Sequence, residues 1–134
     1  LNDHFLYSYE DYLRLLEFAL RDFVSNNDIV AGYPFYGAWG RDTMIVLNTL
    51  MHTPGNLKLA EKVLMHYRRE MKDGLIPNMR AESGREANYD TVDATLWFVI
   101  LMWKLGRYKQ DKAFWRGSIK LIEEVLTGTL NTSQ

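Results

Sequence analysis

The chain has 134 residues, the size of a single domain with room for a substantial core. Hydrophobic residues make up 47% and charged residues 25%, an ordinary globular composition that argues against disorder. The formal net charge of −1 gives no positive excess to attract nucleic acid or anionic lipid, and the absence of cysteine excludes disulfides, thiolate catalysis and Cys-ligated metal.

Hydrophobic periodicity predicts five helices along the chain. Helices over residues 9–23, 57–72 and 111–126 are amphipathic, each with one apolar stripe and one charged face. Helices over residues 42–52 and 92–105 are apolar on nearly every side. A buried strand is an alternative for residues 96–103, but no partner strand is apparent and a helix is preferred.

Several residues mark the expected helix ends. Ser8 and Asn56 stand at the N-cap positions of the first and third helices, and Gly74 lies just past the third. Asp93 is expected to cap the fourth helix and Gly106 to end it.

The alternation of amphipathic and apolar helices predicts two layers, with inner helices wrapped by outer ones. The long connections, residues 24–41 and 73–91, fall at the same end of such an arrangement, where long ordered loops usually carry function. The sequence around Asp42 is weakly repeated around Asp93, again at a helix start. The predicted fold class is all-α, with helical hairpins forming part of an (α/α)6 toroid.

Both long connections contain candidate functional residues. Residues 31–45, AGYPFYGAWGRDTMI, combine glycines and aromatic residues with an Arg-Asp pair; the plain alternative is a tight aromatic loop with Asp42 as an N-cap. Residues 74–93 are rich in hydrogen-bonding side chains, as a polyol ligand requires, although a solvated surface loop would have the same composition.

Three motifs in order resemble the amylo-α-1,6-glucosidase domain of glycogen-debranching enzymes. They are AGYPFYGAWGRDTMI, then DGLIPN at residues 73–78, then NYDTVDATLWF at residues 88–98. The resemblance covers roughly residues 30–108. It implies an (α/α)6 glycosidase domain related to glucoamylases, and chain 1–134 would be the N-terminal, incomplete part of it.

The resemblance also implies a set of residues that bind glucose in the −1 subsite. Arg41 would donate to sugar hydroxyls and Asp42 would accept from them. Asp90 stands where the family pattern has asparagine, a change that keeps the size of the side chain and removes a hydrogen-bond donor. The full set is Tyr33, Trp39, Arg41, Asp42, Asn78, Asp90, Asp93 and Trp97.

No catalytic residue is assigned. An inverting glycosidase needs two carboxyl groups ~6.5–9.5 Å apart. The resemblance places the acid in a later Thr-Trp-Met-Asp motif and the base further on, beyond Gln134, and we therefore expect this chain alone to be inactive.

The remaining expectations concern ligands, partners and location. No metal site and no cofactor is expected, because His4, His52 and His66 are scattered without a carboxylate at ligand spacing. The expected partner is an α-glucan such as glycogen or a limit dextrin, with self-association possible through exposed inner helices. A non-catalytic carbohydrate-binding module or a helical interaction module are the alternatives. A cytoplasmic location is expected, because the chain shows no signal peptide and no apolar stretch of the ~18 residues that a membrane helix needs.

Overall fold

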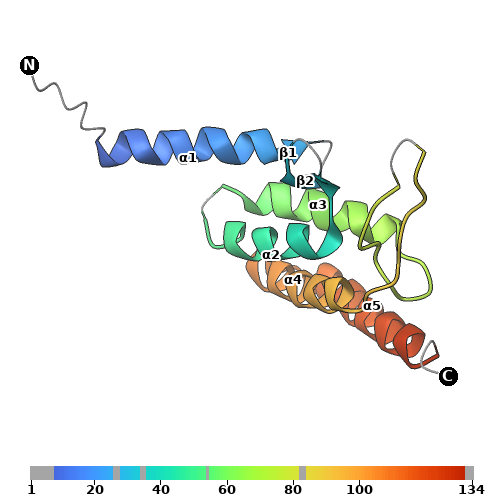
Figure 1. The fold of residues 1–134 in the computed structure, drawn as a ribbon. Helices are drawn as coiled ribbons and strands as arrows, with labels where there is room; N and C mark the ends of the chain where they lie inside the picture. Colours follow the sequence, from blue (N-terminus) through green and yellow to red (C-terminus); the bar gives the residue numbers. More distant parts are fainter. Residues whose placement is uncertain (1–7, 26–27, 34–35, 54, 82–83, 132–134) are drawn as a thin grey trace, which may run out of the picture.

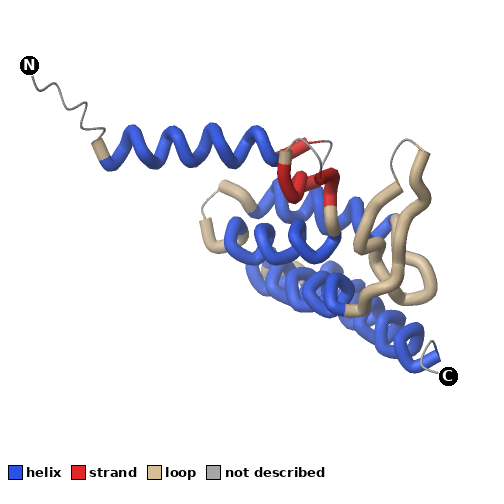
Figure 2. The backbone as a smooth tube through the Cα atoms, viewed as in Figure 1, coloured by secondary structure: helices blue, strands red, loops and turns tan. Residues whose placement is uncertain are grey.

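The computed structural model describes residues 8–25, 28–33, 36–53, 55–81 and 84–131, with side-chain environments up to residue 128. The described chain is mostly helical, as predicted, with a small three-stranded sheet (Figures 1 and 2). The helices are α1 (Tyr9–Phe23), α2 (Gly40–Leu50), α3 (Leu57–Arg69), α4 (Asp93–Lys109) and α5 (Lys112–Asn131).

Local capping explains why α1 begins and ends where the sequence predicted. The Ser8 hydroxyl accepts a hydrogen bond from the Asp11 backbone N–H at 3.2 Å, and Asp11 accepts from the Ser8 backbone N–H at 2.9 Å. This reciprocal capping box satisfies two N–H groups that a helix start leaves unpaired. The helix has no buried residue; in its apolar stripe only Leu20 is half-buried and packs against the core, so most of this expected outer helix does not wrap the inner ones. Figure 1 shows α1 extending away from the other helices.

The predicted start of α4 lies within one residue of the observed one, whereas its predicted end was wrong for an identifiable reason. Gly106 does not end the helix; it is buried inside it, and a Cβ there would lie 3.4 Å from the Phe114 ring of α5. The helix ends instead at Gln110, which adopts the left-handed conformation with φ of 53°. Asp93 is the first helical residue and Val92 occupies the N-cap position without a side-chain bond. The glycine therefore serves close helix packing rather than termination.

Helix α2 packs against α4, α4 also packs against α5, and α3 contacts both α2 and α4. Their shared core includes Met44, Leu47, Phe98 and Leu101, all fully buried. The two apolar helices are not buried on every side, however. The exposed fraction is 45% at Ile45, and Leu96, Ile100 and Trp103 of α4 are similarly exposed.

The connection over residues 24–41, predicted as a loop, contains the sheet. Strands β1 (Val24–Ser25), β2 (Asp28–Gly32) and β3 (Tyr36–Ala38) pair antiparallel in the order β1-β2-β3. The second long connection meets the first, because the Gly40 N–H donates to the Asn78 carbonyl at 2.7 Å and Trp39 forms a β-bridge with Met79. This confirms that both connections lie at one end of the helices (Figure 2). Among the described residues, no helix is both long and apolar enough to cross a membrane.

Candidate functional site

An ion pair joins the starts of the two inner helices. Arg41 in the first turn of α2 donates from Nη1 to Oδ2 of Asp93 in the first turn of α4 at 2.7 Å. The two side chains are 53% and 42% exposed, so the pair is open to a ligand. Partial burial raises the pKa of Asp93, but the hydrogen bonds from Arg41 and from the Ala94 N–H outweigh it and hold that pKa below its usual value. Asp93 is therefore an ionised hydrogen-bond acceptor at neutral pH.

Asn78 lies next to the start of α2, where its backbone holds it. Its carbonyl accepts from Gly40 and its N–H donates to the Asn88 carbonyl at 2.8 Å. The close approach depends on Gly40 having no side chain, because a Cβ there would lie 2.4 Å from the Pro77 carbonyl oxygen. The Asn78 side chain is buried, and its Oδ1 has no hydrogen-bond partner in the described structure. A buried polar atom left unpaired is costly and favours any group that can donate to it.

The two tryptophans of the predicted site lie near these groups along the chain. Trp39 immediately precedes α2 and is half-buried, with its backbone bridged to Met79. Trp97 follows Asp93 by one helical turn and packs partly against the core. Both are therefore placed close in the chain to the Arg41–Asp93 pair.

Asp42 lies at the same end of the molecule but borders a different hollow. It lines a mainly apolar cavity of about 370 Å³ between α1, β2 and α2, together with residues such as Leu20, Ile29 and Ile45. Arg41 and Asp42 thus share the first turn of α2, but neither Arg41 nor Asp93 lines the cavity that Asp42 borders.

The structure does not place Tyr33 and Asp90 with the pair. The Tyr33 hydroxyl donates to the Asp22 carbonyl at 2.6 Å, and its ring lies against Phe23 of α1. Asp90 is exposed and exchanges hydrogen bonds with Asn88, accepting from its amide at 3.0 Å.

The sequence analysis missed a buried polar cluster behind this end of the molecule. Asp28 of β2, only 3% exposed, pairs with Arg80 of the second connection at 2.5 Å, and Arg80 makes two further hydrogen bonds to Glu70. Tyr67 and Thr43 each donate to Asp28 Oδ1 at 3.1 Å. The partners are far apart in the sequence, and Arg80 lies in a polar stretch typical of a solvated loop, so no local pattern marked the cluster.

Charge and burial shift the pKa values inside this cluster. Hydrogen bonding to Arg80 lowers the pKa of Glu70, despite the opposing effect of burial. Burial, with the nearby charge of Asp28, raises the pKa of the Tyr67 hydroxyl. Tyr67 is therefore a neutral hydrogen-bond donor over the whole physiological range.

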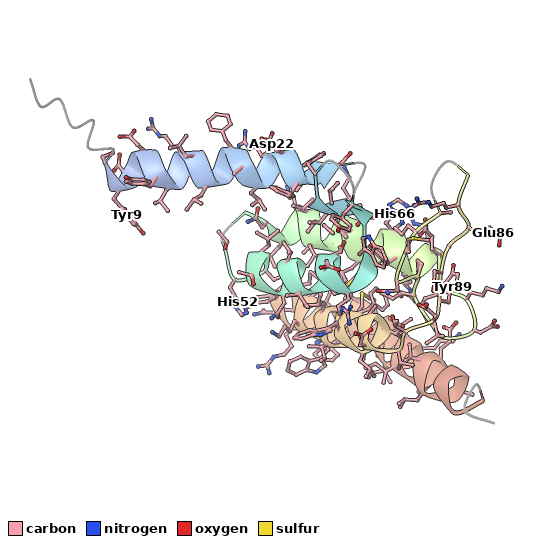
Figure 3. The ribbon with its side chains drawn as sticks, in the orientation of Figure 1. Tyr9, Asp22, His52, His66, Glu86 and Tyr89 are labelled. Atoms are coloured by element: carbon pink, nitrogen blue, oxygen red, sulfur yellow. The ribbon has the colours of Figure 1, made fainter. Side chains whose placement is uncertain are left out.

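His66 corrects one expectation about the histidines. Its Nε2 lies 3.4 Å from Glu70 Oε1, one helical turn away, so a carboxylate is within reach. The same nitrogen is 2.6 Å from Arg80 Nη2, so a cationic guanidinium occupies the position that a metal ion would need. Figure 3 labels His66 on α3 and His52 far from it. Within the described residues, no group of three or more His, Asp and Glu side chains is arranged to hold a metal ion, and His4 lies outside them.

The fold and this site define a mostly helical protein whose polar groups meet where two adjacent inner helices begin. A family model described as Amylo-alpha-1,6-glucosidase matches residues 13–133, and the chain belongs to the amylo-alpha-1,6-glucosidase family. This confirms the resemblance seen in the sequence motifs.

One relative of similar sequence is a protein of Saccharomyces cerevisiae (strain ATCC 204508 / S288c) named Glycogen debranching enzyme. It is 32% identical to this chain over 77 residues, which cover 54% of this chain and 5% of the yeast protein. The matched segment is thus a small part of that relative's length. No solved structure matches the chain.

Proposed function

We propose that this chain supplies glucose-binding groups, those of the −1 subsite, to an amylo-α-1,6-glucosidase that acts on α-glucan. The Arg41–Asp93 ion pair is the observation that carries the proposal. It offers a guanidinium donor and a carboxylate acceptor, both partly exposed, at one point on the surface. Neighbouring hydroxyls of a sugar ring need such a donor and acceptor side by side, and charge-assisted hydrogen bonds are the stronger ones.

Binding, and not proton transfer, is the role we assign to Asp93. A general acid must carry a proton at the working pH, and inverting hydrolysis needs an acid and a base on opposite sides of the bond. The lowered pKa of Asp93 leaves it without that proton. We accordingly expect the 134-residue chain to bind a glucose unit without cleaving its α-1,6 bond.

The test uses isomaltose, a disaccharide with an α-1,6 bond, titrated into the chain and followed by NMR. Arg41→Ala should weaken binding about ten- to a hundredfold, because a charged hydrogen bond contributes ~1.5–3 kcal/mol. Arg116→Ala is the matched control, since Arg116 is exposed on α5. Equal affinities for wild type and Arg41→Ala would refute the binding role, and release of free glucose by the wild type would refute the non-catalytic one.

We also propose that the helices form part of an (α/α)6 toroid in the cytoplasm. Disulfides are rare in that compartment, and the chain has no cysteine with which to form one. The packing of α2 against α4, and of α4 against α5, supports this arrangement. Its exposed side is the α4 stripe, which consists of Leu96, Ile100 and Trp103 at helical spacing.

Self-association of the 134-residue chain through the α4 stripe follows from the same arrangement. Sedimentation velocity should show a concentration-dependent shift that Leu96→Glu abolishes and that Lys58→Glu, an exposed position on α3, leaves unchanged. A wild-type chain that stays monomeric at all concentrations would contradict the proposal.

A further inference from the structure

The buried ion pair between Asp28 and Arg80 belongs to no sugar-binding group described above. Asp28 is 3% exposed and the Arg80 side chain is 16% exposed. A carboxylate this deeply buried requires a close partner and several hydrogen bonds, so its surroundings are fixed in one arrangement. The question is what this arrangement holds in place.

On one side, Asp28 holds the first turn of α2. The Thr43 hydroxyl lies 3.1 Å from both Asp28 Oδ1 and the Ile29 carbonyl. The Tyr67 hydroxyl, from α3, bridges Asp28 and Thr43. Thr43 follows Arg41 by two residues, so these bonds set where the helix turn carrying Arg41 lies.

On the other side, Arg80 holds the second connection against α3. Its guanidinium makes two bonds to Glu70, at 2.7 and 2.5 Å, in addition to the one to Asp28. Arg80 lies two residues after Asn78, and the backbone carbonyl of Asn78 accepts a hydrogen bond from the Gly40 N–H. Gly40 is the residue immediately before Arg41 in the chain. The cluster therefore holds the chain on both sides of Arg41: Thr43, two residues after it, from the strand side, and Gly40, immediately before it, from the loop side.

We propose that Arg80 is a positioning residue for the proposed glucose-binding pair: by joining Asp28 to Glu70, it holds the segment 78–80 so that Arg41 meets Asp93. This inference rests on the proposed function, because it names what holds that same site. Arg80 itself is mostly buried and has its donors directed at protein carboxylates, so it acts through Arg41 and not on the sugar.

The test replaces Arg80 by lysine, which keeps the charge but cannot bridge two carboxylates with a planar fork of donors. Arg85→Lys is the matched control, because Arg85 is exposed on the same connection. Two quantities are measured by NMR for each variant. One is the affinity for isomaltose, and the other is the hydrogen-exchange rate of the Gly40 amide, which reports its bond to Asn78.

Arg80→Lys should weaken isomaltose binding about tenfold and speed Gly40 exchange by about the same factor. Exchange at Leu101, in the core of α4, should stay within about twofold of wild type, which separates a positioning role from general destabilisation. In the double variant with Arg41→Ala, affinity should fall no further than in Arg41→Ala alone, because both changes act through one group.

Unchanged Gly40 exchange in Arg80→Lys, or additive losses of affinity in the double variant, would overturn the inference. Should Arg80→Lys fail to fold, Glu70→Gln loosens Arg80 from one side only and should give the same two changes, each about threefold. A wild-type chain that does not bind isomaltose refutes the proposed function, and the Gly40 exchange rates then decide the positioning role by themselves.

Discussion

Gly40 is a position at the candidate site where a single added methyl group should be strongly destabilising. An alanine Cβ there would lie 2.4 Å from the Pro77 carbonyl oxygen and 3.2 Å from the Asn78 Cα, both of them backbone atoms that cannot rotate away. Helix α2 or the second connection must then shift. The shift also stretches the 2.7 Å hydrogen bond from Gly40 to Asn78.

The magnitude follows from these two effects. Overpacking costs about 1–3 kcal/mol and a lost hydrogen bond ~1 kcal/mol, so Gly40→Ala should lower the free energy of unfolding by about 2–4 kcal/mol. A domain of this size is typically stable by about 5–15 kcal/mol, so the variant should remain folded.

Gly117→Ala provides the matched comparison. Gly117 also lies in a helix, and the nearest atom to a Cβ there is Nη1 of Arg68, a flexible side chain, at 3.9 Å. Without a clash, the lower backbone entropy of alanine should raise stability by about 0.5–1 kcal/mol. Urea unfolding followed by circular dichroism measures both. A Gly40→Ala variant that is as stable as the wild type or more so would contradict the close contact between Gly40 and the second connection.

Two further predictions concern the buried cluster. Tyr67→Phe should lower the free energy of unfolding, measured in urea, by about 1.5–3 kcal/mol, because it removes a hydroxyl that donates to a buried carboxylate. Tyr108→Phe, which loses an exposed hydrogen bond to His52, is the control. Equal losses of stability in the two variants would count against the cluster. Glu70 has a lowered pKa, so its stabilising effect should be complete above its ordinary value of 4.5 and should disappear as the pH falls through the lowered pKa. The stability difference between wild type and Glu70→Gln should therefore be larger at pH 7 than at pH 3, and a difference independent of pH would contradict this.

Features set by neighbouring residues were predictable from the sequence. The capping box of Ser8 and Asp11 is complete within four residues, and α1 begins and ends where the periodicity indicated. The family motifs likewise placed Arg41 and Asp93 at two helix starts, where the structure has them.

Features set by contacts between distant segments were not predictable in this way. Gly106 has the sequence signature of a helix end, yet it lies within α4 because the rings of α5 approach it closely. Asp28 and Arg80 come together only when β2 and the second connection meet over α3, and each residue alone is typical of a polar loop. The strands of residues 24–38 were missed because they are two to five residues long and carry no clear alternation.

Helix α1 differs from the other helices in how it must maintain its structure. It buries no side chain, so its stability depends on its capping box and on contacts near its C-terminal end with β1 and β2. An isolated helix of 15 residues is marginal in water. Its first turns should therefore unwind and reform many times during each opening of the core, which makes this segment the preferred point of entry for a protease.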